Sequence, residues 1–182
     1  MQGKLVGTVI IVALLTLILI AVFAGRRSPS VSDPTGESAP CSARLQELRE
    51  YEKASEDQAQ QFVSHASALL RVAASQSKNP GEFLNAKMLQ IESGETADSL
   101  RFSSTLAEVY GSVCSDRDRA KLVPVVAAQI DYLSQNLQFI QKDVQVVGAH
   151  TTDSNIKERA IQMSRDLANS LLELQSLKSK LR

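Results

Sequence analysis

The sequence holds few residues whose types and spacing could carry out chemistry. It has two histidines, His65 and His150, and neither belongs to a group of residues with the types and spacing of a metal site. The Glu-x-x-His pattern of di-iron bundles, the Cys-x-x-Cys-His haem attachment and a glycine-rich phosphate loop are all missing from it. We therefore expect no enzymatic activity, no metal and no cofactor, with His65 a partly buried helix residue and His150 a solvated turn residue.

The two cysteines, Cys41 and Cys114, are the remaining reactive pair. If one long helix leaves Cys41 and a second one returns to Cys114, both sulfurs lie at the same end of the domain. A disulfide there would close a loop of about 70 residues and stabilise the fold by about 4 kcal/mol in the chain-entropy model. We predict this disulfide for a domain outside the cytoplasm. In a reducing compartment the alternative is two unpaired, small apolar side chains.

The most distinctive element of the sequence is one long apolar run. Leu5 to Ala24 comprises twenty residues without a charged side chain, bounded by Lys4 and by Arg26-Arg27. As a helix it would be about 30 Å long, the thickness of the hydrocarbon core of a bilayer. The alternative is a signal peptide cleaved before Gly25, but the apolar part of such a peptide usually has about 7–15 residues. We predict an uncleaved signal-anchor that spans the membrane once.

The rest of the chain divides around this anchor. Residues 1–4 form a short tail, 5–24 the transmembrane helix, 25–40 a flexible stalk rich in proline, glycine and serine, and 41–182 one helical domain. A four-residue tail is a poor candidate for a translocated domain. We therefore expect a single-pass membrane protein with the tail inside and the C-terminal domain extracytoplasmic.

The composition of residues 41–182 excludes one class of partner. This part has 17 Lys and Arg against 18 Asp and Glu, a net charge of −1, and the chain has no tryptophan. Nucleic-acid-binding domains usually show a basic face with stacking aromatic rings. We expect no nucleic acid as a partner.

Turn signals divide the domain into helices at about 42–77, 81–115, 118–148 and 153–181. Asn79-Pro80-Gly81-Glu82 predicts a capping Asn, a Pro at the first helical position and a Glu at the third. Cys114 to Asp118 offers two Asp caps, and Gly148 predicts a helix stop before a polar restart. Ser93-Gly94-Glu95-Thr96 is a candidate interruption of the second helix, and Pro124 predicts a later start or a kink in the third.

Apolar side chains recur at spacings of three and four, as on the buried face of a helix. The clearest stripes are in the third and fourth helices, and the first helix has a thinner one in which Glu52 and Ser55 weaken the middle. The stripes are Val123, Val126, Ile130, Leu133, Leu137, Ile140, Val144 and Val147; Ala160, Met163, Leu167, Leu171, Leu174, Leu177 and Leu181; and Leu45, Leu48, Ala59, Phe62, Ala66, Leu69 and Ala73.

Long helices joined by short turns run antiparallel to their neighbours, which predicts an all-α, up-down-up-down four-helix bundle. The alternative is a pair of long, coiled-coil-like hairpins that completes its core as a homodimer. In that architecture the stripes of the third and fourth helices would face another chain.

In an up-down bundle, a group of basic residues would lie at the end nearest the membrane, where they could attract anionic lipid. The ordinary alternative is helix-end chemistry, because cations favour helix C-termini and Asp116 and Asp118 dilute the charge. The group consists of Arg26, Arg27, Arg44, Arg117, Arg119, Lys121, Lys178, Lys180 and Arg182.

Two function classes remain. The first is a membrane-tethered structural or interaction module that binds another protein of the cell envelope. The second is a bundle that captures a small ligand between its helices, as a sensor or carrier would. The polar positions Glu52 and Ser55 could line such a pocket.

Overall fold

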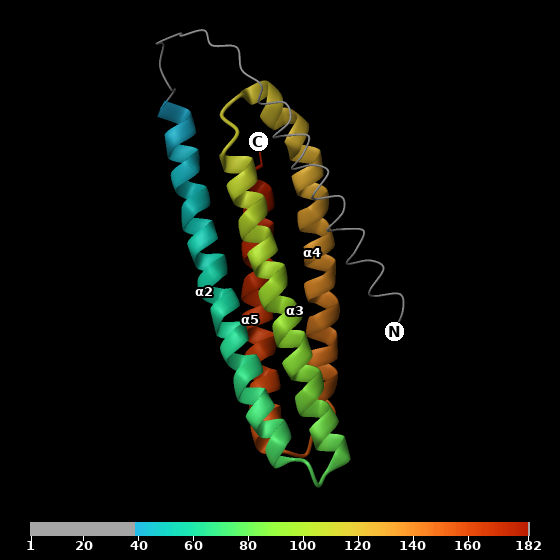
Figure 1. Cartoon of the computed structure of the whole chain (residues 1–182). Coiled ribbons are helices and arrows are strands. Elements are labelled where there is room, and N and C mark those ends of the chain that lie inside the picture. The colour runs from blue at the N-terminus through green and yellow to red at the C-terminus, as the bar shows by residue number, and fades with distance from the viewer. Residues whose placement is uncertain (1–38, 182) are drawn as a thin grey trace, which may run out of the picture. The chain divides into compact units, whose positions relative to one another are not determined.

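The computed structural model describes the backbone of residues 39–181 and the side chains of residues 46–181. This part of the chain has four helices and no strand, which confirms the all-α prediction for it (Figure 1). The helices are α2 (Ala39–Ser75), α3 (Pro80–Gly111), α4 (Asp116–His150) and α5 (Ser154–Ser179). None of these four is long and apolar enough to cross a membrane. The anchor predicted at 5–24 lies outside the described residues, as do residues 25–38 of the predicted stalk.

The four helices lie side by side in a bundle, and each runs antiparallel to the next (Figure 1). Each helix packs on its neighbour in the chain, and α5 packs back on α2. Across the bundle, α3 and α5 approach each other closely, whereas the described parts of α2 and α4 do not. The start of α2, the α3–α4 connection and the end of α5 therefore share one end of the bundle (Figure 1).

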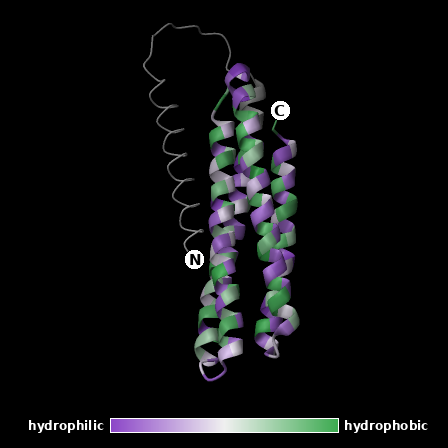
Figure 2. Ribbon diagram, turned by 90° about the vertical axis from the view of Figure 1, so that its right-hand side faces the viewer, coloured by the Kyte–Doolittle hydropathy of each residue, from purple (hydrophilic) through white to green (hydrophobic). Residues whose placement is uncertain are grey.

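The α4 and α5 helices bury the stripes that their periodicity predicts. Of the predicted residues, Val123, Leu171 and Leu181 are only partly buried, while the others are in the core. Ile156, which lies in the first turn of α5 and outside the predicted stripe, is also buried. Figure 2 shows polar and apolar residues following one another along each helix, the pattern of helices that bury one face. The stripes thus face the interior of this chain, and the alternative in which they face a second chain is wrong.

The α2–α3 pair packs differently, through small side chains. The backbones of these two helices approach each other over a longer stretch than those of any other described pair. Helix separation depends on the side chains at the contact, and small ones allow a short distance. The small buried residues are Ser55, Ala59 and Ala73 of α2, and Ala86, Ser93, Thr96, Ala97, Ser103, Ala107 and Gly111 of α3.

Helix ends follow some of the sequence signals and correct others. Asn79 caps α3 as predicted, because its side chain accepts a hydrogen bond from the Glu82 N–H with Pro80 at the first position. Ser115, rather than either Asp, caps α4. Gly148 does not stop α4, which continues to His150. This glycine provides space instead, because a Cβ there would lie 3.2 Å from the Cβ of Ala160.

The interruption predicted at 93–96 is absent from α3, and the later start predicted at Pro124 is absent from α4. The α3 helix continues through 93–96, where the Ser93 and Thr96 hydroxyls donate to the carbonyls of Leu89 and Glu92 one turn earlier. These bonds satisfy the polar side chains without breaking the helix. The α4 helix begins at Asp116, well before Pro124, so the later start is wrong.

Candidate functional site

The two histidines take part in local contacts. The His65 Nε2 atom lies 3.3 Å from Oδ2 of Asp166, and Gln162 donates to the other oxygen of Asp166 at 2.9 Å. His65 is half-buried, as predicted, whereas the exposed His150 is the last residue of α4 rather than a turn residue. Within the described side chains, no three His, Cys, Asp or Glu residues gather in a way that could hold a metal ion.

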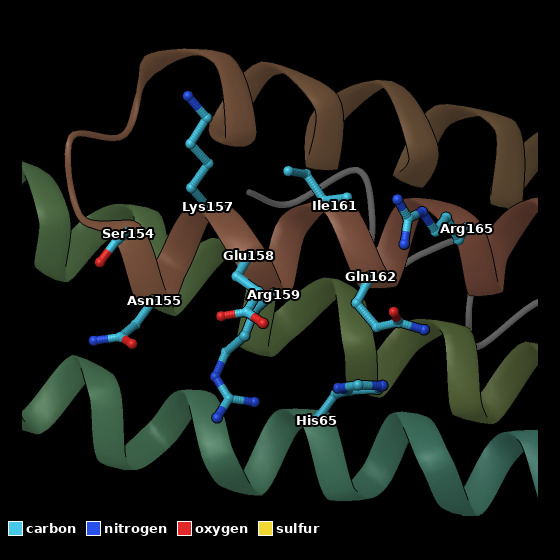
Figure 3. A pocket seen from close by; sticks show the side chains of 9 residues that line it. All are labelled: His65, Ser154, Asn155, Lys157, Glu158, Arg159, Ile161, Gln162 and Arg165. Carbon is cyan, nitrogen blue, oxygen red and sulfur yellow. The ribbon is translucent and has the colours of Figure 1, made fainter.

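A cleft of about 620 Å³ lies over the outer surface of the first half of α5. Figure 3 shows its polar side chains spread around the helix. Arg159 and Gln162 point toward α2, while Lys157 and Ile161 project from the other side of α5 (Figure 3). The side chains therefore do not converge on one point, as those of a small-ligand site do. The lining residues are His65, Ser154, Asn155, Lys157, Glu158, Arg159, Ile161, Gln162 and Arg165.

Polar residues that flank the interruption of the α2 stripe form a hydrogen-bonded layer inside the bundle. The Tyr51 hydroxyl donates to Ser103 of α3 at 2.8 Å. The Gln58 amide donates to Oε1 of Glu173 at 2.6 Å, and its carbonyl oxygen accepts from Ser170 at 2.9 Å, both on α5. Of the two positions at which the sequence suggested a ligand pocket, Ser55 is buried beside these contacts and Glu52 is half-buried. Tyr51 is buried but was not a predicted core residue. Its ring is apolar and its hydroxyl is polar, so its residue type alone does not indicate burial.

Two atoms of this layer lack a hydrogen-bond partner in the structure. They are the Ser55 hydroxyl and Oε2 of Glu173. Burial raises the pKa of Glu173, and the hydrogen bond from Gln58 only partly opposes this. Burial also raises the pKa of Tyr51, against the hydrogen bond with Ser103. The pKa of the half-buried Glu52 is raised by burial and by the charge of Glu108.

At the opposite end of the bundle, Glu82 joins the two hairpins. Its carboxylate accepts hydrogen bonds from the Thr151 hydroxyl, and at 2.8 Å from both the N–H and the hydroxyl of Thr152. The Asn85 amide adds a fourth bond at 3.3 Å. The Thr151 hydroxyl and the Thr152 N–H are the main causes that lower the pKa of Glu82 to about 2. Glu82 thus ties the start of α3 to the α4–α5 connection.

We expect Glu82→Gln to lower the melting temperature at pH 7, because an amide group would face donors that need an acceptor. A carboxylate with a folded-state pKa below its ordinary 4.5 stabilises the fold above pH 4.5 and loses this contribution as the pH falls toward 2. The wild-type and variant melting temperatures should therefore converge between pH 4.5 and 2. Glu95→Gln, on the exposed side of the same helix, is the control. A constant difference across this range would show that Glu82 is not the group responsible.

The predicted basic group is largely engaged in ion pairs where it is described. The buried Arg119 guanidinium pairs with Asp116, Lys121 lies 2.8 Å from Asp118, and Lys178 lies 2.6 Å from Asp131. The pair with Lys121 lowers the pKa of Asp118. Arg117 and Lys180 are exposed at the same end. The side chains of Arg26, Arg27, Arg44 and Arg182 lie outside the described residues.

Cys114 lies in the α3–α4 connection and takes part in a disulfide bond. No free cysteine occurs among the described residues. Cys41 is in the first turn of α2, at the same end of the bundle (Figure 1). The Cys41 side chain lies outside the described part of the chain, and the predicted Cys41–Cys114 pairing stays a prediction.

A row of exposed apolar residues on α4 is the feature that sequence reasoning missed. Val125, Tyr132, Phe139 and Val146 are 44%, 53%, 64% and 55% exposed, and each follows the last by seven residues. We call these four residues the outer stripe. The spacing is visible in the sequence, but the stronger inner stripe of the same helix obscures it. Soluble monomers seldom expose extended apolar patches, and these patches commonly mark interaction sites.

Comparison of the chain with models of protein families, with curated proteins and with solved structures finds no match. The outer stripe and the contacts described above are therefore the basis for a functional conclusion.

Proposed function

We propose that the chain is a membrane-tethered helical bundle that binds another protein of the cell envelope and has no catalytic activity. The tether is the uncharged run 5–24, which has the length and composition of a single transmembrane helix. The bundle is placed outside the cytoplasm, joined to this anchor by the stalk.

The observation that carries the proposal is the outer stripe of α4. Its two aromatic residues, Tyr132 and Phe139, are of the types that dominate binding energy when they are buried in a protein interface. Leu84 and Ile91, also seven residues apart, are exposed on the neighbouring α3. An interaction module needs such a surface, whereas the fold of this domain does not.

The ligand-binding alternative has less support. Beside Glu52 and Ser55, the positions that suggested an internal pocket, Tyr51 and Gln58 bind side chains of α3 and α5. The cleft over α5 spreads its polar groups around the helix (Figure 3). We therefore favour a docking surface over a small-molecule site.

Photo-crosslinking of the full chain in its native membrane tests this proposal. A benzophenone amino acid in place of Phe139 should form covalent adducts with a protein seated on the stripe. The matched control replaces Gln60, an exposed residue of α2, the helix diagonally across the bundle from α4. Adducts at position 139 that greatly exceed those at position 60 support the proposal. Equal labelling at the two positions, or none at 139, contradicts it.

A further inference from the structure

The outer stripe has a repeat that suits one kind of partner. Val125, Tyr132, Phe139 and Val146 keep a strict seven-residue interval over three heptads. An α-helix has 3.6 residues per turn, so a seven-residue row stays in line only against a helix that winds around it. The fitting occupant is therefore a long helix with the same repeat. The α4 helix itself has that repeat.

At the two ends of the stripe, small neighbours allow such a helix to come close. On one side of the stripe, three residues after its members, α4 places Ala128, Gln135, Lys142 and Ala149. The two alanines have small side chains, so they add little bulk at the ends of this side. The Lys142 Nζ lies 5.5 Å from the centre of the Phe139 ring, so its charge is held at the edge of the stripe.

The two sides of the stripe carry opposite charges, so the stripes of two copies can be complementary to each other. Asp143 lies on the other side, four residues after Phe139 and seven after Asn136. The Asn136 amide donates to Ser99 at 3.4 Å, which shows that this side of α4 faces α3. When two α4 helices pack in parallel about a two-fold axis, the Lys142 side of each meets the Asp143 side of the other. In an antiparallel pair like sides meet, and each Lys142 loses this counter-charge.

We propose that the envelope protein bound at the outer stripe is a second copy of this chain, packed through α4 in parallel and in register. This inference rests on the proposed function, because the membrane anchor attaches both copies at their N-terminal side and concentrates them in one plane. Identical residues then face each other across the axis, with the Tyr132 and Phe139 rings at the centre. Two Lys142–Asp143 pairs close the flanks.

This dimer differs from the hairpin dimer considered from the sequence. There the inner stripes would meet another chain, but they are buried inside this one. The outer stripe leaves the bundle intact and joins two completed domains. The interface is isologous, so one surface serves both copies.

Two variants of the full chain that each add one cysteine, Val125→Cys and Val146→Cys, test the inference in membranes treated with a short bismaleimide. The parallel dimer predicts crosslinked chains from each variant alone. It predicts few crosslinks between a Val125→Cys chain and a Val146→Cys chain. Gln60→Cys is the control and should give no crosslinked pair. Crosslinking only between Val125→Cys and Val146→Cys chains would mean an antiparallel pair and would overturn the inference.

A charge exchange gives an independent readout. We expect Lys142→Asp to weaken the crosslinked pair by roughly fivefold, the range of two exposed ion pairs. The double variant Lys142→Asp, Asp143→Lys should restore it, because the two charges merely trade places. No loss in the single variant, or no rescue in the double one, would contradict the pairing.

The failure of this inference can be told from the failure of the proposed function. If neither cysteine variant crosslinks while the benzophenone at position 139 labels a different protein, the second copy is wrong and the docking surface stands. If position 139 labels no protein, both are wrong.

Discussion

Leu137→Asp is expected to unfold the bundle. Leu137 lies at the centre of the inner stripe of α4 and is inaccessible to solvent. Its truncation to alanine alone should cost about 2–5 kcal/mol, through lost burial and the cavity that remains. A carboxylate there would in addition be buried without a partner, which costs further free energy. Together these losses approach the whole stability of a typical domain, about 5–15 kcal/mol.

Circular dichroism of the purified full chain in detergent measures this effect. The wild type should melt cooperatively, and Leu137→Asp should show no transition and a large loss of helical signal from the bundle. Gln138→Asp adds the same group one residue away, on the exposed side of α4, and should change the melting temperature little. Similar melting of the two variants would mean that the core face of α4 is misassigned.

The inner core was predictable because one periodicity decides it. Leu133 and Leu137 sit in an unbroken pattern of three and four, and burial follows directly from that pattern. Asn79 before Pro80 predicted the start of α3 for an equally local reason, since the cap and the residue at the first position are adjacent. Such signals need only neighbouring residues.

Features that depend on the meeting of distant segments were not predictable in this way. Glu82 was predicted only as the third residue of its helix, but its carboxylate bonds to Thr151 and Thr152 across the end of the bundle. Gly148 looked like a helix stop, yet it is small because α5 passes close by. In both cases the local pattern has a common meaning, and a tertiary contact overrides it.

The outer stripe of α4 was predictable only in part. The interval from Val125 to Val146 could be read from the sequence, but only the structure shows that a separate stripe already forms the core. The polar residues of α2 carried the opposite lesson. Glu52 and Ser55 suggested a pocket, whereas their neighbours Tyr51 and Gln58 form hydrogen bonds across the interior.

Removal of the apolar run is expected to have the other large effect, because it should change where the protein resides. Twenty uncharged residues favour insertion, while an arginine near the centre of such a helix costs about 2.5–3.5 kcal/mol. The double variant Leu14→Arg, Leu15→Arg should therefore insert poorly. A chain that begins at Gly25 should leave the membrane, because it lacks the uncharged run 5–24.

Membrane fractionation after high-salt and alkaline washing tests the tethered bundle most directly. Our account predicts that the full-length chain stays in the membrane pellet through both washes, with its native N-terminus intact. The chain that begins at Gly25 should appear in the supernatant. Recovery of the natural protein as a soluble species that starts at Gly25, or its release by washing, would contradict the tether.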